Sequence, residues 1–103
     1  MVQYSPQDGP AVIRGSYLSG TAAACGTTST AITAPTGASL ALIHAEGAAV
    51  YWSVNASSVV GSTAPGYVAQ DQVGFIPEID NLTKVAVIGG ASGAIAHVEF
   101  YQF

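Results

Sequence analysis

Residues 84–103, KVAVIGGASGAIAHVEFYQF, carry the strongest β signal in the chain. Lys84–Ile88 is a short run rich in valine and isoleucine, and the glycine-rich stretch 89–93 that follows is typical of a hairpin loop. Ala94–Phe103 then alternates, with Ala, Val and Phe at 96, 98 and 100 and polar or aromatic residues between them. Such alternation is expected of a strand with one buried face, so this segment predicts an antiparallel pair of strands.

Shorter runs of the same kind fill the rest of the chain, separated by many of its 12 glycines and 5 prolines. No window has a sustained helical period. The further predicted strands are Ala11–Leu18, Thr28–Ala34, Leu40–Glu46, Ala48–Val54, Tyr67–Gln70 and Val73–Pro77. About eight short strands at this spacing predict an all-β domain, a two-sheet β-sandwich or jelly roll of antiparallel strands.

The period of two in these strands also predicts a core. Its members are large apolar side chains that share one face of a strand: Val50, Trp52, Val85, Val87, Val98 and Phe100. Residues 1–27 differ, because they are rich in small residues and contain few bulky apolar ones. We expect them to form an N-terminal arm that includes the first strand, and residues 28–103 to form the sandwich domain.

Charge is scarce in this protein. Asp, Glu, Lys and Arg make up 8% of its 103 residues, against about 25% in ordinary soluble domains. A charge-poor surface tends to associate, which predicts one copy among many in an assembly. Two basic residues and a net charge of −4 exclude a nucleic-acid footprint.

Other features bear on the compartment. The start of the chain lacks the basic and apolar segments of a secretory signal. No apolar run of the roughly 20 residues needed to span a membrane is present, and a single cysteine, Cys25, excludes an intrachain disulfide. These features predict synthesis in a cytoplasm and no membrane partner.

The sharpest candidate site is a pair of His-x-Glu motifs, His44/Glu46 and His97/Glu99. Alternation puts both members of each motif on one strand face, where two imidazoles and two carboxylates can ligate a divalent metal if the strands are neighbours. The His-x-His pattern of cupin metalloenzymes is missing, however. We therefore interpret the four residues as surface or interface positions, and we expect no metal and no cofactor.

No other catalytic set is visible. No serine lies in a Gly-x-Ser-x-Gly motif, and no basic residue near Cys25 would activate its thiol. The chain is therefore predicted not to be an enzyme. Tyr51, Tyr67 and Tyr101 leave two interpretations open: a platform that stacks on sugars, or residues of an interface or core.

Several short motifs follow one another in an order that is similar to a known family. They are Ala34-Pro35-Thr36-Gly37, AEGAAVYW at 45–52, Thr63-Ala64-Pro65, DNLTKVAVI at 80–88 and Val98-Glu99-Phe100-Tyr101. Over this part the chain resembles small structural proteins of tailed bacteriophages. The resemblance implies a virion protein on the outer capsid surface, made in the host cytoplasm.

The role that the resemblance favours is a head decoration (cement) protein, a homo-oligomer and first of all a trimer, bound to the major capsid protein. A tail or fibre-adaptor module and a carbohydrate-binding β-sandwich are the alternatives. Because Pro6 and Pro10 oppose pairing in a central strand, we expect the N-terminal arm to contact neighbouring subunits or the capsid.

Overall fold

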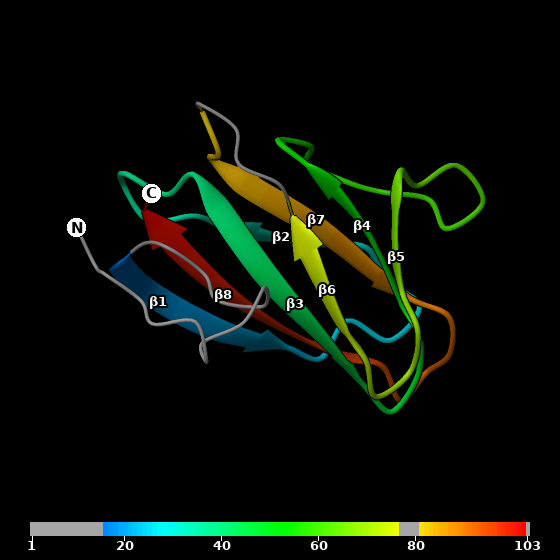
Figure 1. The fold of residues 1–103 in the computed structure, drawn as a ribbon. Helices are drawn as coiled ribbons and strands as arrows, with labels where there is room; N and C mark the ends of the chain where they lie inside the picture. Colours follow the sequence, from blue (N-terminus) through cyan, green and yellow to red (C-terminus); the bar gives the residue numbers. More distant parts are fainter. Residues whose placement is uncertain (1–15, 77–80, 103) are drawn as a thin grey trace.

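The computed structural model describes residues 16–76 and 81–102 (Figure 1). The described chain consists of β-strands joined by turns and loops. The strands are β1 (Ser16–Ala23), β2 (Thr30–Thr33), β3 (Leu40–Glu46), β4 (Val50–Val54), β5 (Gly66–Val68), β6 (Val73–Ile76), β7 (Lys84–Gly89) and β8 (Ile95–Gln102). Within these residues no helix is long and apolar enough to cross a membrane.

The strands form two four-stranded sheets that lie one behind the other (Figure 1). Sheet I has the order β1-β8-β3-β6 and sheet II the order β2-β7-β4-β5, and every pairing is antiparallel. β1 therefore pairs with β8, β2 with β7, β3 with β6 and β4 with β5. This is the strand order of an eight-stranded jelly roll, and it confirms the all-β, two-sheet prediction.

The core lies between the two sheets and is built from the alternating side chains predicted for it. Val50, Val85, Val87, Val98 and Phe100 are each 0% exposed. Trp52 is different: it is half-buried and packs against this cluster from its edge. Its cross-strand partners are Val87 of β7 and Gly66 of the outermost strand β5. Because Gly66 has no side chain, the indole of Trp52 lies over its backbone, and one side of the ring stays exposed.

The first strand lies further along the chain than the sequence predicts. It runs over Ser16–Ala23, whereas the prediction was Ala11–Leu18, of which residues 11–15 lie outside the described residues. Pairing with β8 extends from Ser16 opposite Gln102 to Ala23 opposite Ala96, with a β-bulge between Tyr17 and Ser19. Residues 16–23 of the predicted arm are thus an edge strand of sheet I, while residues 1–15 lie outside the description.

Apart from β3, the other strands differ from the predicted bounds by one or two residues at an end. Most are shorter because turns take up the flanking residues, whereas β5 begins one residue earlier and β7 ends one residue later than predicted. Ala48 and Ala49 belong to the turn after Gly47, whose φ is +81°. The β5–β6 connection is closed by a hydrogen bond from the Gln72 amide to the Ala69 carbonyl. It includes Asp71 at a φ of +61°. Pro77 and Phe103, the predicted ends of two strands, lie outside the described residues.

Candidate functional site

The two His-x-Glu motifs meet on the outer face of sheet I. β3 and β8 are neighbours, and their register places His44 directly opposite His97. Ile43 and Ala45 on β3 point into the core and are fully buried. Their neighbours His44 and Glu46 therefore lie on the outer face, as alternation requires.

A short contact joins the motifs across the two strands. The Nε2 atom of His97 lies 2.6 Å from Oε1 of Glu46, with side-chain exposures of 38% and 52%. Because an ionised carboxylate can only accept, the N–H at Nε2 of His97 donates in this contact. The rings of His44 and His97 lie beside each other, with centroids 5.4 Å apart and planes tilted by 31°. Glu46 thus orients His97, and His97 flanks His44.

Glu99 belongs to a different contact. Its carboxylate accepts a hydrogen bond of 3.1 Å from the hydroxyl of Tyr101, two residues along β8. Partial burial, together with the bond to Glu99 and its negative charge, raises the pKa of Tyr101. The ring of Tyr101 packs edge-on against Tyr17 of β1, with centroids 5.7 Å apart.

The four candidate ligands therefore share a face but do not form a metal site. In the described ranges, no group of three or more His, Cys, Asp or Glu is arranged to hold a metal ion. Glu46 bonds to His97, while Glu99 is opposite Leu42 in the next row of the β3–β8 ladder. Glu46 therefore contacts His97, and Glu99 contacts Tyr101, so the two carboxylates point to different partners.

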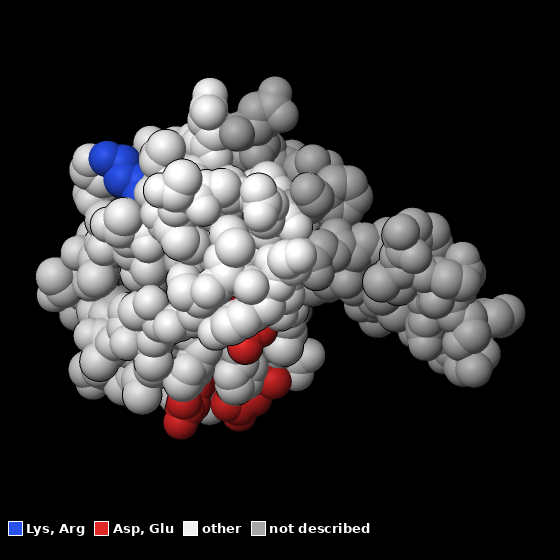
Figure 2. Space-filling model, turned by 90° about the vertical axis from the view of Figure 1, so that its left-hand side faces the viewer, with Lys and Arg blue, Asp and Glu red and all other residues white. Residues whose placement is uncertain are grey.

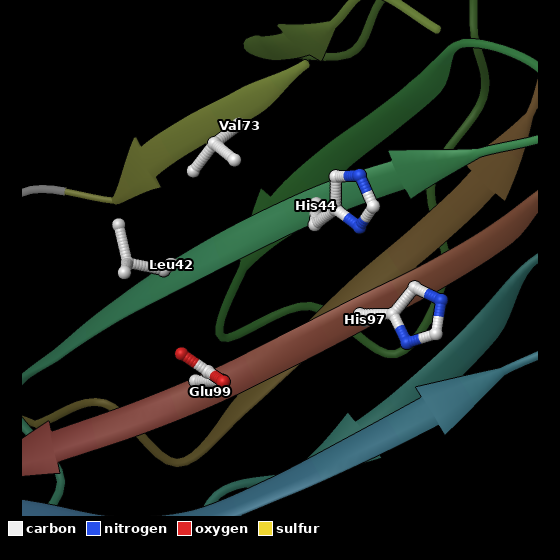
Figure 3. Close-up of a pocket in the computed structure, with 5 residues that line it drawn as sticks. All are labelled: Leu42, His44, Val73, His97 and Glu99. Atoms are coloured by element: carbon white, nitrogen blue, oxygen red, sulfur yellow. The ribbon is translucent and has the colours of Figure 1, made fainter. Parts of the chain in front are cut away.

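A shallow cavity of about 330 Å³ opens on this face. It is lined by Leu42, His44, Val73, His97 and Glu99 (Figure 3). The register explains the set, because Leu42 is opposite Glu99, and His44 lies between His97 of β8 and Val73 of β6. One side of the cavity is consequently aliphatic and the other carries imidazole and carboxylate groups.

The sequence did not identify Leu42 and Val73 as part of a site. Leu42 is two residues before His44 and therefore lies on the same face of β3, so alternation along the strand could have identified it. Val73 had no such signal, because its place beside His44 depends on the β3–β6 register.

Charged side chains are unevenly distributed over the molecule. The described Asp and Glu residues, Glu46, Asp71 and Glu99, gather at one end of the surface seen in Figure 2. The blue Lys and Arg atoms of that view lie apart from the red ones, and Lys84 is the basic residue of the described ranges. Its Nζ donates a hydrogen bond of 3.0 Å to the Ser57 hydroxyl. The cavity is therefore on the acidic end of the protein.

The three tyrosines proposed as a sugar platform do not share a surface. Tyr51 and Tyr67 pair across β4 and β5 with ring centroids 5.2 Å apart, on the outer face of sheet II. Tyr101 lies on the outer face of sheet I beside Tyr17. A three-tyrosine platform is therefore not formed, because the two sheets turn these outer faces in opposite directions.

Cys25 lies within the hydrophobic core. It is 3% exposed, and its thiol donates a long hydrogen bond of 3.8 Å to the carbonyl of Ala94. Burial raises the pKa of the Cys25 thiol, which lowers the thiolate fraction at neutral pH. This environment is that of a packing residue.

Comparisons of the chain with protein-family models, with curated proteins and with solved structures gave no match. The resemblance to tailed-phage structural proteins stays a prediction.

Proposed function

We propose that this protein is a non-catalytic structural subunit of a tailed-bacteriophage virion, acting as a decoration (cement) protein on the outer capsid surface. In this role it binds the major capsid protein as a homo-oligomer, with the trimer as the expected form. It carries no cofactor and contacts neither nucleic acid nor membrane.

The observation that carries this proposal is the character of the exposed surface. Five large apolar side chains are more than half exposed, distributed over sheet I, sheet II and the loop before β5: Tyr17 58%, Val60 61%, Tyr67 58%, Val73 63% and Phe75 51%. Charged groups around them are few. Exposed apolar area with little charge favours burial against other subunits.

The jelly roll is compatible with such a role, because this architecture recurs in viral capsid domains and lectins. The same fold also carries other functions, and the exposed apolar surface is what favours this one. In this role the protein stabilises the shell by burying surface area between subunits. An interface of ordinary size covers about 1,600 Å², and apolar area contributes about 25 cal/mol per Å². Repetition of a modest contact over many copies would strengthen a shell.

Self-association is the first property to measure. Size-exclusion chromatography with light scattering at 10–100 µM protein is expected to give the mass of a trimer of the 10.3 kDa chain. A second run with the double variant Val73→Ser, Phe75→Ser tests whether the exposed apolar side chains of β6 contribute to self-association. A monomer at every concentration would contradict the trimer.

Two other functions remain as alternatives. A tail or fibre-adaptor module would use the same kind of surface at a lower copy number. A carbohydrate-binding module is favoured by one observation, the adjacent rings of Tyr51 and Tyr67 on the exposed face of sheet II. Binding on a glycan array that is lost in Tyr67→Ala would favour this second function over the structural one.

A further inference from the structure

We propose that the cavity between β3, β6 and β8 receives an arginine side chain from a partner protein. This inference rests on the proposed function, because it identifies a contact through which an assembly subunit would dock. Its basis is complementarity of charge and shape at the cavity lined by Leu42, His44, Val73, His97 and Glu99.

The first requirement is an acceptor for a cation. Glu99 is exposed, and from the described residues its carboxylate accepts one hydrogen bond, donated by the Tyr101 hydroxyl. An ionised carboxylate offers about four acceptor positions, so most of its capacity remains for a ligand. Lys84, the basic residue of the described ranges, donates instead to the hydroxyl of Ser57. The described part of the chain therefore provides no lysine or arginine side chain to Glu99.

The second requirement is a surface for an aliphatic stem. Leu42 and Val73 form the apolar side of the cavity, and Val73 is 63% exposed. Arginine and lysine cover such surfaces with their methylene groups while the charged end reaches a polar site. Figure 3 shows Glu99 in the row next to the two imidazoles, with Leu42 opposite it on β3. A side chain lying between Leu42 and Glu99 would contact both the apolar surface and the carboxylate.

The imidazoles favour arginine over lysine. A guanidinium is planar, stacks on aromatic rings and binds a carboxylate through two parallel hydrogen bonds. His44 and His97 present two rings tilted by 31° at the edge of the cavity. The volume of about 330 Å³ is at the small end of ligand sites, which suits one side chain. A lysine ammonium would gain the charge contact but not the stacking.

The experiment uses a small arginine probe on the whole chain. Nα-acetyl-arginine methylamide is titrated into isotope-labelled protein at pH 7.5, and NMR shifts of Leu42, Val73 and the histidine rings are followed. We expect saturable shifts confined to this face, with a dissociation constant in the millimolar range. The neutral isostere Nα-acetyl-citrulline methylamide is expected to bind at least fivefold more weakly.

Variants locate the contact. Glu99→Gln should weaken arginine binding at least fivefold, while Asp71→Asn, which removes another carboxylate of the acidic end outside the cavity lining, should change it less than twofold. Amide spectra verify that both variants are folded.

The lysine analogue Nα-acetyl-lysine methylamide is titrated in the same way and is expected to bind more weakly than the arginine probe. Equal binding of the citrulline or lysine probe, or unchanged binding in Glu99→Gln, would overturn the proposal. The probe assay measures binding to this cavity, and neither the mass of the oligomer nor the presence of the chain in virions, so its failure would remove the arginine site and leave the structural function to its own tests.

Discussion

Phe100→Ala tests the arrangement of the core against a control that removes the same atoms elsewhere. Phe100 is 0% exposed on the inner face of β8, whereas Phe75 on β6 is 51% exposed. Truncating a buried phenylalanine costs about 3–5 kcal/mol, the lost transfer free energy plus the cavity left behind. About half of the Phe75 surface already contacts water, so Phe75→Ala should cost less than about 2 kcal/mol on the same area scale.

Urea unfolding followed by circular dichroism measures both free energies of unfolding. The two free energies should differ by at least about 1 kcal/mol, which is a measurable part of the roughly 5–15 kcal/mol total of a typical domain. Equal losses in the two variants would refute the assignment of the inner and outer faces of sheet I. A change in the urea dependence itself would indicate an altered unfolded state and would require a second probe.

Three further predictions concern the turns and the thiol. Gly47→Ala should destabilise by about 2 kcal/mol or more, because φ is +81° and a Cβ would lie 2.3 Å from the Gly93 carbonyl oxygen. Gly93→Ala, where a Cβ meets nothing within 4 Å, should change the melting temperature little, and equal effects would contradict the turn geometry. Asn55→Ala should cost about 2–3 kcal/mol, since its side chain donates to the Asn81 carbonyl and accepts from the amide and hydroxyl of Thr83; a loss below 0.5 kcal/mol by urea unfolding would contradict these bonds. Because burial raises the pKa of Cys25, Ellman's reagent at pH 8 should react far more slowly with native than with urea-unfolded protein, and equal rates would show an accessible thiol.

Strands with regular alternation could be predicted from the sequence. Leu40–Glu46 is found with the predicted bounds, and β8 differs at its ends alone. In β8 apolar and polar residues alternate over 96–100, and β3 alternates in the same way over 43–46, so the pattern in these parts specifies the faces. β1 was misplaced because Ser19–Ala23 is made of small residues with weak strand preference. Its pairing with β8, at the other end of the sequence, determines its position.

The candidate site was predictable in its residues but not in its geometry. The His-x-Glu motifs could be recognised as the chemistry-bearing residues of two strands, and parity placed each motif on one face. That β3 and β8 are neighbours in register, with Glu46 on His97, depends on a pairing between residues 51 positions apart. The placement of Tyr51 and Tyr101 could not be predicted either, since nothing in the sequence near them indicates that their strands belong to different sheets.

Copy number in the virion is the most direct test of the proposed function. Quantitative mass spectrometry of purified particles, from a phage that encodes this chain, gives its ratio to the major capsid protein. The account predicts a component present in hundreds of copies that fractionates with heads. Absence of the chain from purified particles, or a dozen or fewer copies fractionating with tails, would contradict a decoration protein.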